Sequence, residues 1–557
     1  PTAIMILLLW FFTPLITRLI SLPVKIHAPH LHAEQLFFLR QCARRTWGFF
    51  ERFVVAEDHW LPPDNFQEYG GAIIAHRTSP TNIGLSLLAN VTAHDFGYIP
   101  TGALLARTSN TLGAMALMER YQGHFYNWYD TLSLQPLNPV YISTVDSGNL
   151  AGHLLVLRQG LLALIDQPVF SKNWLEGIRD TVGIVVEMGV EMSTTQATTG
   201  ESHAALMRLQ TLLESFYEEL PDIPITHLAC LDKVLECVKN FNDCVGSEFS
   251  SDFRWWSDNL VQQCGAQRDE LLWLALPELT LSGNTIPTLR ELANTDEGYQ
   301  AKARIATIEK LADDAYHFAQ MQYDFLFDKS RGLLAIGYNV TERRRDSGFY
   351  DLLASESRMT SFIAIAQRQL PQESWFSLGR LLTGSANGPV LLSWSGSMFE
   401  YLMPLLVMPN YANTLLDQTN AAAVAHQIEY GKLRSVPWGV SESGYNLFDK
   451  QLNYQYHAFG VPGLGLKRGL ADDLVIAPYA TALGLMIAPE AACTNLQRLA
   501  ALGMQGQFGF YEAMDYTPSR QRSGETSVIV RSFMAHHQGM SLLAFAYLLL
   551  GKPMQRR

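Results

Sequence analysis

Acidic residues beside aromatic residues, in stretches rich in Gly, Ser and Asn, are the part of this sequence with the clearest chemical content. They are Asp130 after Asn127-Trp128-Tyr129, Asp146 in Asp146-Ser147-Gly148-Asn149, Glu356 after Tyr350, Glu400 before Tyr401, Glu442 between Trp438 and Tyr445, and Glu512 and Asp515 around Tyr511. Two carboxyl groups can cleave a glycosidic bond, because one protonates the leaving oxygen while the other attacks the anomeric carbon or activates water. Aromatic surroundings raise the pKa of the acid, which then keeps its proton at neutral pH. For any single one of these carboxylates, a helix cap or a buried ion pair is the competing interpretation.

Aromatic and polar residues near these carboxylates provide what a sugar ring needs. The residues predicted to stack on sugar rings are Tyr126, Trp128, Trp394, Trp438, Tyr445 and Tyr454. The residues predicted to hold hydroxyl groups are Asp64, Asn65, Gln67, Arg77, Asn82, Asn127, Asp146, Asn149, Glu400, Glu512 and His537. The sequence therefore predicts a carbohydrate-binding cleft.

Other chemistries lack their motifs. The sequence has no phosphate-binding loop, no GxGxxG, no GxSxG and no HExxH. Its 6 Cys are scattered without metal-ligand spacing, and the adjacent His536 and His537 would point to different sides of a helix. No metal and no cofactor are expected. A net charge of −12 without long Lys/Arg runs argues against a nucleic-acid partner.

A repeated plan positions these residues: a short polar loop, then an apolar helix. It occurs at six places, where residues 79–84, 146–149, 355–358, 395–398, 477–481 and 534–539 each run into an apolar stretch. Amphipathic helices are predicted between them, for example at 36–53, 104–121 and 303–326. We therefore expect a mainly α fold, an (α/α)6 toroid or barrel whose polar loops gather at one end. Short β-hairpins are predicted at the cleft face, at 332–340 and 454–466.

Two segments depart from this plan. Residues 170–300 are more polar and mostly helical, which predicts an inserted helical subdomain, with the toroid formed by 25–169 and 301–557. Residues 3–17 carry no charge. Because a membrane span needs roughly 20 apolar residues, we interpret residues 1–24 as the end of a transmembrane segment; a buried core helix is the alternative.

Long strings across the chain carry a family resemblance. Residues 61–68, 75–82, 123–131, 145–150, 350–358, 438–443 and 456–463 resemble signatures of cyclic β-1,2-glucan synthases, in the same order. The resemblance runs from about residue 30 to 557. It implies the middle domain of a bacterial inner-membrane enzyme, on the cytoplasmic face, with glycosyltransferase and phosphorylase-like domains as partners. This middle domain resembles β-1,2-glucanases but is expected to close linear β-1,2-glucan into a ring, with retention.

The same resemblance places the two catalytic carboxylates on Glu442 and Glu356, with Glu442 as the acid/base and Glu356 as the nucleophile. Two alternatives stay open. An endo-β-1,2-glucanase would hydrolyse the same polymer, and an inverting one would separate its carboxyl groups by roughly 6.5–9.5 Å. A non-catalytic β-1,2-glucan-binding module would only hold the chain for neighbouring domains.

Overall fold

Six helices entered from polar loops form the inner layer of the molecule. They are α3 (Pro80–Asp95), α5 (Thr144–Ala163), α12 (Ser357–Ala366), α14 (Met398–Leu402), α16 (Pro478–Gly484) and α18 (Ala535–Leu549). The computed structural model describes residues 2–20, 30–68, 71–193, 200–219, 224–246, 249–274, 286–296, 298–385 and 388–557. All six predicted loop–helix junctions are found, and α14 and α16 are buried along their whole length.

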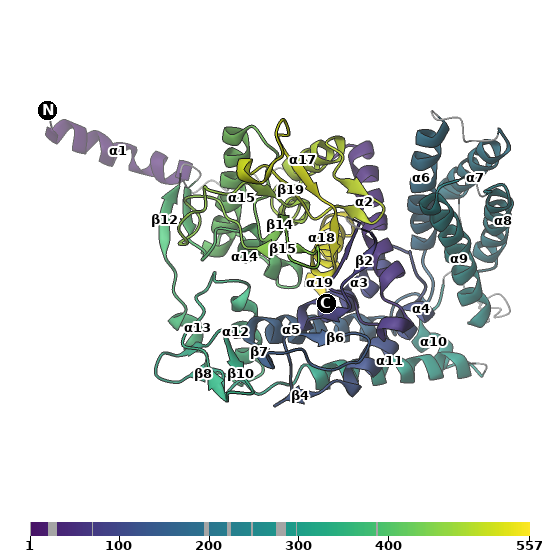
Figure 1. Cartoon of the computed structure of the whole chain (residues 1–557), viewed down its shortest axis with the longest axis horizontal. Coiled ribbons are helices and arrows are strands. Elements are labelled where there is room, and N and C mark those ends of the chain that lie inside the picture. The colour runs from purple at the N-terminus through teal and green to yellow at the C-terminus, as the bar shows by residue number, and fades with distance from the viewer. Residues whose placement is uncertain are drawn as a thin grey trace.

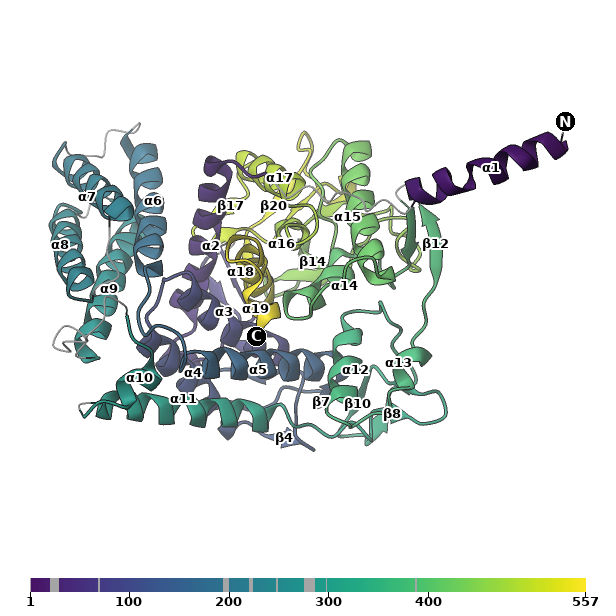
Figure 2. The same cartoon turned by 180° about the vertical axis from the view of Figure 1, so that it is seen from behind.

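A second layer of helices covers the first. The outer helices are α2 (Ala33–Phe53), α4 (Thr101–Leu117), α11 (Tyr299–Phe318), α13 (Ser374–Ser377), α15 (Leu415–Arg434) and α17 (Pro489–Ala501). Each packs against one inner helix: α2 on α18, α4 on α3, α11 on α5, α13 on α12, α15 on α14 and α17 on α16 (Figures 1 and 2). The predicted mainly α, (α/α)6 toroid is confirmed.

Side-chain caps determine where the inner helices begin. The Ser79 hydroxyl accepts the backbone N–H of Asn82 at 3.1 Å, and the Ser143 hydroxyl accepts that of Asp146 at 3.3 Å. Such caps satisfy N–H groups that the first turn of a helix leaves unpaired. A side-chain hydrogen bond connects α12 to α14: the buried Arg358 guanidinium donates to the carbonyl oxygen of Glu400 at 2.7 Å.

Short antiparallel strands tie the loops together. The pairings are β1 (Asn65–Gln67) with β2 (Ile73–Ile74) and β21 (Ser532–Met534); β3 (Arg77–Thr78) with β6 (Tyr129–Asp130); β4 (Arg120–Tyr121) with β5 (His124–Phe125); β10 (Gly337–Asn339) with β7 (Tyr141–Ser143) and β11 (Arg344–Arg345); β8 (Phe327–Asp328) with β9 (Leu333–Leu334); β12 (Leu382–Ser385) with β13 (Gly388–Leu391); β14 (Ser443–Phe448) with β15 (Tyr454–His457); β19 (Ala513–Asp515) with β16 (Val475–Ile476) and β20 (Val528–Val530); and β17 (Gln505–Gly506) with β18 (Gly509–Phe510). Among the residues that the structure describes, three 3-10 turns lie at Ala56–Asp58, Met403–Leu406 and Pro518–Arg520, and α19 (Pro553–Arg556) is the last helix. The β1–β21 pairing joins loops more than 460 residues apart, Phe66 lying opposite Phe533.

Two predicted helices end earlier than expected. The helix predicted at 104–121 stops at Leu117, and the one predicted at 303–326 stops at Phe318. Arg120–Tyr121 instead forms a hairpin with His124–Phe125, turning through Gln122 and Gly123, which both have positive φ. Glycine adopts that conformation without strain, and the turn ends the helical run.

Four helices lie to one side of the toroid. They are α6 (Asn173–Ser193), α7 (Gly200–Glu219), α8 (Pro224–Asp243) and α9 (Ser251–Trp273), packed on one another, with α6 against α2 (Figures 1 and 2). The short α10 (Leu289–Ala293) leads back to α11. They fall within the predicted insertion at 170–300, whose boundaries remain a prediction.

Helix α1 (Thr2–Ile20) extends away from the rest of the molecule (Figures 1 and 2). It is apolar, with exposed side chains from residue 3 to residue 18, and contains Pro14 and Arg18. Within the described ranges, no helix has the length and hydropathy needed to cross a membrane. The interpretation of residues 1–24 as the end of a transmembrane segment stays a prediction, and residues 1 and 21–24 lie outside the described part.

Candidate active site

The polar loops meet at a cavity of about 340 Å³ at one end of the toroid. Its walls come from loops before or at the starts of α3, α5, α12, α14 and α18 and from the β14–β15 hairpin. The lining residues are Asp64, Arg77, Ser79, Thr81, Asn82, Asn127, Trp128, Val145, Asp146, Ser355, Glu356, Phe399, Glu442, Tyr456, Met534 and His536. Glu356 and Glu442, distant in sequence, thus face one cavity.

Glu356 lies immediately before α12 and is 3% exposed. One carboxyl oxygen accepts the side-chain N–H of Asn149 at 2.5 Å, and the other accepts the hydroxyl of Ser355. Burial raises the pKa of Glu356 to about 7, and the nearby Asp146 charge adds to this, whereas the two hydrogen bonds oppose it. The carboxyl group can therefore ionise near neutral pH, with donors already in place for its charge.

The backbone that presents Glu356 is strained. Ser355 has φ of +52°, a left-handed conformation that non-glycine residues rarely adopt. Glu400 holds this segment, because its carboxylate accepts the N–H of Ser355 at 3.4 Å and that of Ser395 at 3.0 and 3.1 Å. It also caps its own helix, α14, through Ser397. Glu400, predicted to bind substrate, therefore lies beneath the site, and its carboxylate oxygens are occupied by hydrogen bonds from the loops.

Glu442 lies immediately before β14. Its side-chain oxygen accepts the hydroxyl of Tyr456 at 3.3 Å, and its backbone carbonyl accepts the hydroxyl of Tyr479 at 2.9 Å. Burial raises the pKa of Glu442 to about 8, and the negative charges of Glu356 and Glu400 add to this. Glu442 has one distant donor where Glu356 has two close ones, so the proton is held more firmly on Glu442.

A third carboxylate is connected to Glu356 through a hydrogen-bonded chain. The Thr81 hydroxyl donates to Asp146 at 2.5 Å and accepts the Asn149 side-chain N–H at 3.0 Å. The same Asn149 nitrogen donates to Glu356. Burial raises the pKa of Asp146 above its usual value. A change in the charge of Asp146 therefore changes the pKa of Glu356.

The opposite wall combines a cation, a carboxylate and an indole. Arg77 donates to the buried Asp64 at 2.9 and 3.1 Å, and its guanidinium lies 4.9 Å from the centre of the Trp128 ring. Asn82 and Asn65 also donate to Asp64, at 3.4 and 3.2 Å. Of the predicted residues, the structure therefore brings together at the cavity Asp64, Arg77, Asn82, Asn127, Trp128, Asp146, Glu356 and Glu442, with Asn149 beneath and Asn65 beside Asp64.

Three predicted sugar-stacking residues lie away from the cavity. Trp438 is 6% exposed and packs against Gly484, where an added Cβ would lie 2.6 Å from the indole. Tyr126 is buried and donates to Glu119 at 3.1 Å. Tyr445 packs against Phe459 and beneath the guanidinium of Arg520. These rings are packed within the protein, which leaves their predicted role in stacking on sugars without support.

The remaining predicted residues surround the site. Trp394 is 60% exposed, and its backbone N–H donates to the carbonyl of Leu353, close to Glu356 in sequence. Gln67 is buried and accepts the N–H of Tyr454, fixing the β14–β15 hairpin, while the ring of Tyr454 packs on Phe448. Glu512 and His537 lie behind the wall, joined to each other at 2.9 Å.

Eight lining residues were not among the site residues predicted from the sequence: Ser79, Thr81, Val145, Ser355, Phe399, Tyr456, Met534 and His536. Thr81, Ser355 and His536 are direct neighbours in sequence of predicted residues, which was an available signal. The sequence does not distinguish Tyr456 from Tyr454, because residues two apart in a strand lie on the same face. Which of the two lines the cavity depends on where the β14–β15 hairpin packs. In the described part of the chain, no three His, Cys, Asp or Glu side chains gather closely enough to hold a metal ion.

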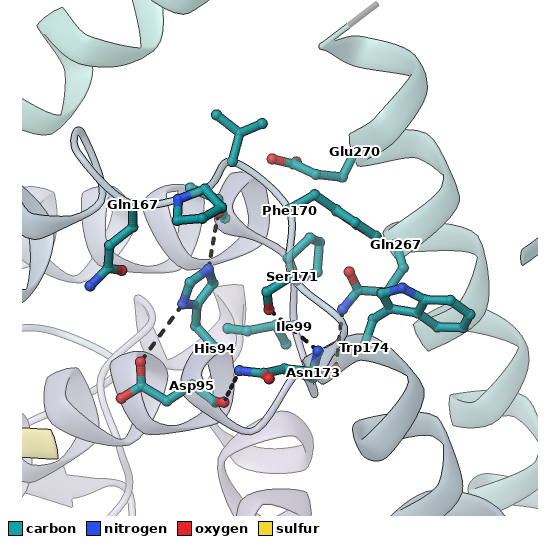
Figure 3. A pocket seen from close by; sticks show the side chains of 15 residues that line it. His94, Asp95, Ile99, Gln167, Phe170, Ser171, Asn173, Trp174, Gln267 and Glu270 are labelled. Carbon is teal, nitrogen blue, oxygen red and sulfur yellow. Dashed lines mark hydrogen bonds and ion pairs between the residues drawn. The ribbon is translucent and has the colours of Figure 1, made fainter. Parts of the chain in front are cut away.

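A second cavity, of about 180 Å³, lies between the toroid and α9 (Figure 3). Its polar groups pair with one another. His94 contacts Thr101 at 3.0 Å, Asn173 donates to the Asp95 carbonyl at 2.9 Å, and Gln267 donates to the Gly97 carbonyl at 3.1 Å. Glu270 is paired with Arg304. With most of these groups paired inside the protein, this cavity has the character of a packing junction, and the carboxyl pair identifies the first cavity as the candidate site.

Comparison with known proteins identifies a homologue of this chain. The chain is 38% identical over 548 residues to the cyclic β-(1,2)-glucan synthase NdvB of Rhizobium meliloti (strain 1021), which covers 97% of this chain. The chain spans 19% of the length of that relative. The resemblance expected from the sequence strings is confirmed as homology to one segment of such a synthase.

Family and structure comparisons agree on the fold. Residues 348–549 match the Glycoamylase family model, described as "Putative glucoamylase", and both Glu356 and Glu442 lie within them. An endo-β-1,2-glucanase from Chitinophaga pinensis, solved with sophorotriose and glucose, superposes with a TM-score of 0.55 at 12% identity, covering 94% of this chain and 95% of that one. An endo-β-1,2-glucanase from Talaromyces funiculosus, solved with sophorose, gives 0.51 at 11% identity, covering 93% and 85%.

Proposed function

We propose that this chain is a retaining transglycosylase that closes linear β-1,2-glucan into cyclic β-1,2-glucan, with Glu442 as acid/base and Glu356 as nucleophile. The observation that carries the proposal is the pair itself: two carboxyl groups on one cavity, one with two close donors and a pKa near 7, the other with one distant donor and a pKa near 8. The name of the homologous synthase indicates the polymer and the product.

In the first step, Glu442 gives its proton to the glycosidic oxygen as the carboxylate of Glu356 attacks the anomeric carbon. The C–O bond to the departing sugar breaks, an ester between Glu356 and the sugar forms, and the departing piece leaves with a free 2-hydroxyl. Asn149 and Ser355 stabilise the carboxylate of Glu356 before attack. Glu442 is left ionised.

In the second step, the far end of the same chain returns as acceptor. Its 2-hydroxyl attacks the anomeric carbon, Glu442 takes the hydroxyl proton, and the ester to Glu356 breaks. Two inversions give retention. The tethered hydroxyl competes with water because it has a high effective concentration, and water must be kept from the ester. Trp128, Arg77 and Asp64 form the wall against which we expect sugar rings to bind.

The hydrolase alternative has a specific observation in its favour. Two solved structures of this fold are of endo-β-1,2-glucanases. The same carboxyl pair would serve an endo-β-1,2-glucanase if water replaced the returning 2-hydroxyl. A non-catalytic β-1,2-glucan-binding module would keep the cavity but would not need two carboxyl groups with raised pKa values lining it.

The test is incubation of the purified domain with linear β-1,2-glucan, following reducing ends and product mass together. Ring closure gives a cyclic product without a reducing end, lighter by one water than a linear chain of the same number of glucose units, while the departing piece keeps the original reducing end. Rising reducing ends with short linear products would make the chain a hydrolase. Glu442→Gln and Glu356→Gln are each expected to lower turnover by at least ~100-fold, while binding of the glucan persists. Wild-type turnover in either variant would refute the assignment of that residue.

The wider setting is part of the same proposal. We expect the domain to work beside glycosyltransferase and phosphorylase-like domains of a longer synthase, at the cytoplasmic face of a bacterial inner membrane. The 19% share of the homologous synthase leaves room for such domains. Fractionation of cells that make the full-length protein, followed by detection of this segment in membrane or soluble fractions, tests the location.

A further inference from the structure

A row of side chains runs from Glu442 into the protein, away from the cavity. The Tyr456 hydroxyl lies 3.3 Å from Glu442 Oε2 and 3.4 Å from His537 Nε2. The other ring nitrogen of His537, Nδ1, lies 2.9 Å from Glu512 Oε2. His537 and Glu512 are 2% and 3% exposed, whereas Tyr456, at 40%, faces the cavity. The row therefore joins a cavity carboxyl group to a buried one.

We infer that Tyr456, His537 and Glu512 form a relay that exchanges a proton with Glu442 while substrate covers the cavity; this inference rests on the proposed role of Glu442 as the acid. The three residues are positioning residues, because only Glu442 contacts the reacting atoms. Their value to a transglycosylase is that the protonation state of Glu442 can be set without admitting water, which would hydrolyse the ester to Glu356.

The proton transfer balances. Glu512 gives its proton to His537 Nδ1, His537 Nε2 gives its proton to the Tyr456 oxygen, and Tyr456 gives its own proton to Glu442. One O–H bond breaks at Glu512 and one forms at Glu442. Tyr456 and His537 end neutral, with the imidazole in its other tautomer. Hydrogen bonds of 3.3–3.4 Å are long, as catalytic contacts often are before substrate binds.

The surroundings favour such an exchange. His537 stacks on Tyr479 with ring centres 3.7 Å apart, and burial holds the pKa of His537 well below its usual value, so that the ring is neutral and carries one N–H. Burial raises the pKa of Glu512 to about 7, so both of its forms are accessible near neutral pH. The Gly444 N–H donates to its other oxygen at 2.9 Å and fixes the carboxyl group.

Other titratable groups face the relay. They are Glu356, Glu400 and Asp146 near Glu442, and Asp64, His536 and Tyr479 near the imidazole of His537 or its neighbour. His536 Nε2 also lies 3.4 Å from the Tyr456 hydroxyl. The branch through His537 is the one whose second nitrogen contacts a carboxyl group, which can supply or accept the proton.

Glu512→Gln provides a test with a defined direction. Because the Gly444 N–H needs an acceptor, the amide oxygen stays there and the amide N–H₂ faces His537 Nδ1. This locks His537 with its proton on Nε2, pointing at Tyr456, and Tyr456 must then donate to Glu442. A hydrogen bond to the charged form lowers a carboxyl pKa, so the alkaline limb of the pH–kcat profile on linear β-1,2-glucan should move down by about one pH unit.

The link through Tyr456 makes the test specific. In a Tyr456→Phe background, Glu512→Gln should leave the alkaline limb where Tyr456→Phe alone puts it. Tyr511→Phe, whose hydroxyl bonds to Glu68 at 2.7 Å, is the matched control and should not move the limb. Glu512→Asp keeps a proton but shortens the side chain. The relay predicts that it retains more activity near neutral pH than Glu512→Gln, whereas a purely structural role predicts the opposite order.

Failure of the relay and failure of the proposed function give different results. An active wild type in which Glu512→Gln shifts the limb equally with and without Tyr456 overturns the relay and leaves the function standing. If the wild type does not act on β-1,2-glucan, nitrogen NMR of the histidine rings tests the relay without relying on activity. A His537 tautomer that changes as Glu512 titrates near pH 7 supports the relay, and a tautomer independent of pH overturns it.

Discussion

Replacing Asp146 with Asn should move the acid limb of the pH–activity profile. The negative charge of Asp146 opposes ionisation of Glu356, so removing it lowers the pKa of Glu356. A nucleophile must be ionised, so activity is lost as pH falls through that pKa. With the pKa lowered, activity should persist to lower pH.

The size of the shift follows from the hydrogen-bonded chain. Contacts of 2.5, 3.0 and 2.5 Å through Thr81 and Asn149 place the two carboxyl oxygens no more than 8.0 Å apart. Two unit charges at that distance interact by about 2 kcal/mol at an effective dielectric constant near 20, and about 0.5 kcal/mol in water. The acid limb should therefore move down by about 0.4–1.5 pH units.

The measurement is kcat/KM on linear β-1,2-glucan as a function of pH, because this ratio reports the free enzyme. Asp146 lines the cavity, so the height of the profile can fall as well, and its position on the pH axis is the informative quantity. Asp328→Asn removes the same charge from a turn that lies away from the cavity, where Asp328 accepts the hydroxyl of Ser330, and should not move the limb. An unmoved limb in Asp146→Asn, or one that moves up, would refute the electrostatic coupling.

Four further outcomes follow from the structure. The wild-type kcat/KM should form a narrow bell, since Glu356 gains a proton below its pKa of about 7 and Glu442 loses one above its pKa of about 8; a flat profile from pH 5 to 9 would contradict these roles. Trp438→Ala should lower the free energy of unfolding by about 3–5 kcal/mol in denaturant melts, because Trp438 is core, whereas Trp394→Ala, at an exposed site, should change it by less than about 0.5 kcal/mol. Gly148→Ala should destabilise by about 1–3 kcal/mol or more, because the new Cβ would lie 2.6 Å from the Thr360 Cα between α5 and α12. The matched change Gly113→Ala, in α4 with nothing within 4 Å, should instead stabilise by about 0.5–1 kcal/mol; equal effects of the two would show that the packing of α5 on α12 is not as described.

Local pattern was sufficient to predict the helical layers. An apolar run after a polar cap, as at Ser79 or Ser397, predicts a buried helix from its own residues, because capping and periodicity act over one or two turns. Helix ends were less predictable. The helix expected to reach residue 121 stops at Leu117, because the following residues are held in a strand pairing.

The roles of side chains also divide into those that local sequence predicts and those that depend on tertiary contacts. The sequence alone determined the inner helices, the family resemblance, and that Glu356 sits at a loop–helix junction; Glu442, expected at such a junction too, instead precedes the strand β14. Only the tertiary structure decided that Trp438 is core while Trp128 lines the cavity, that Glu400 holds a loop, and that Tyr456 connects Glu442 to His537 and Glu512. The reason is physical: burial and hydrogen-bond partners arise between segments up to hundreds of residues apart, and an aromatic or acidic residue looks the same in the sequence whichever neighbours the fold brings to it.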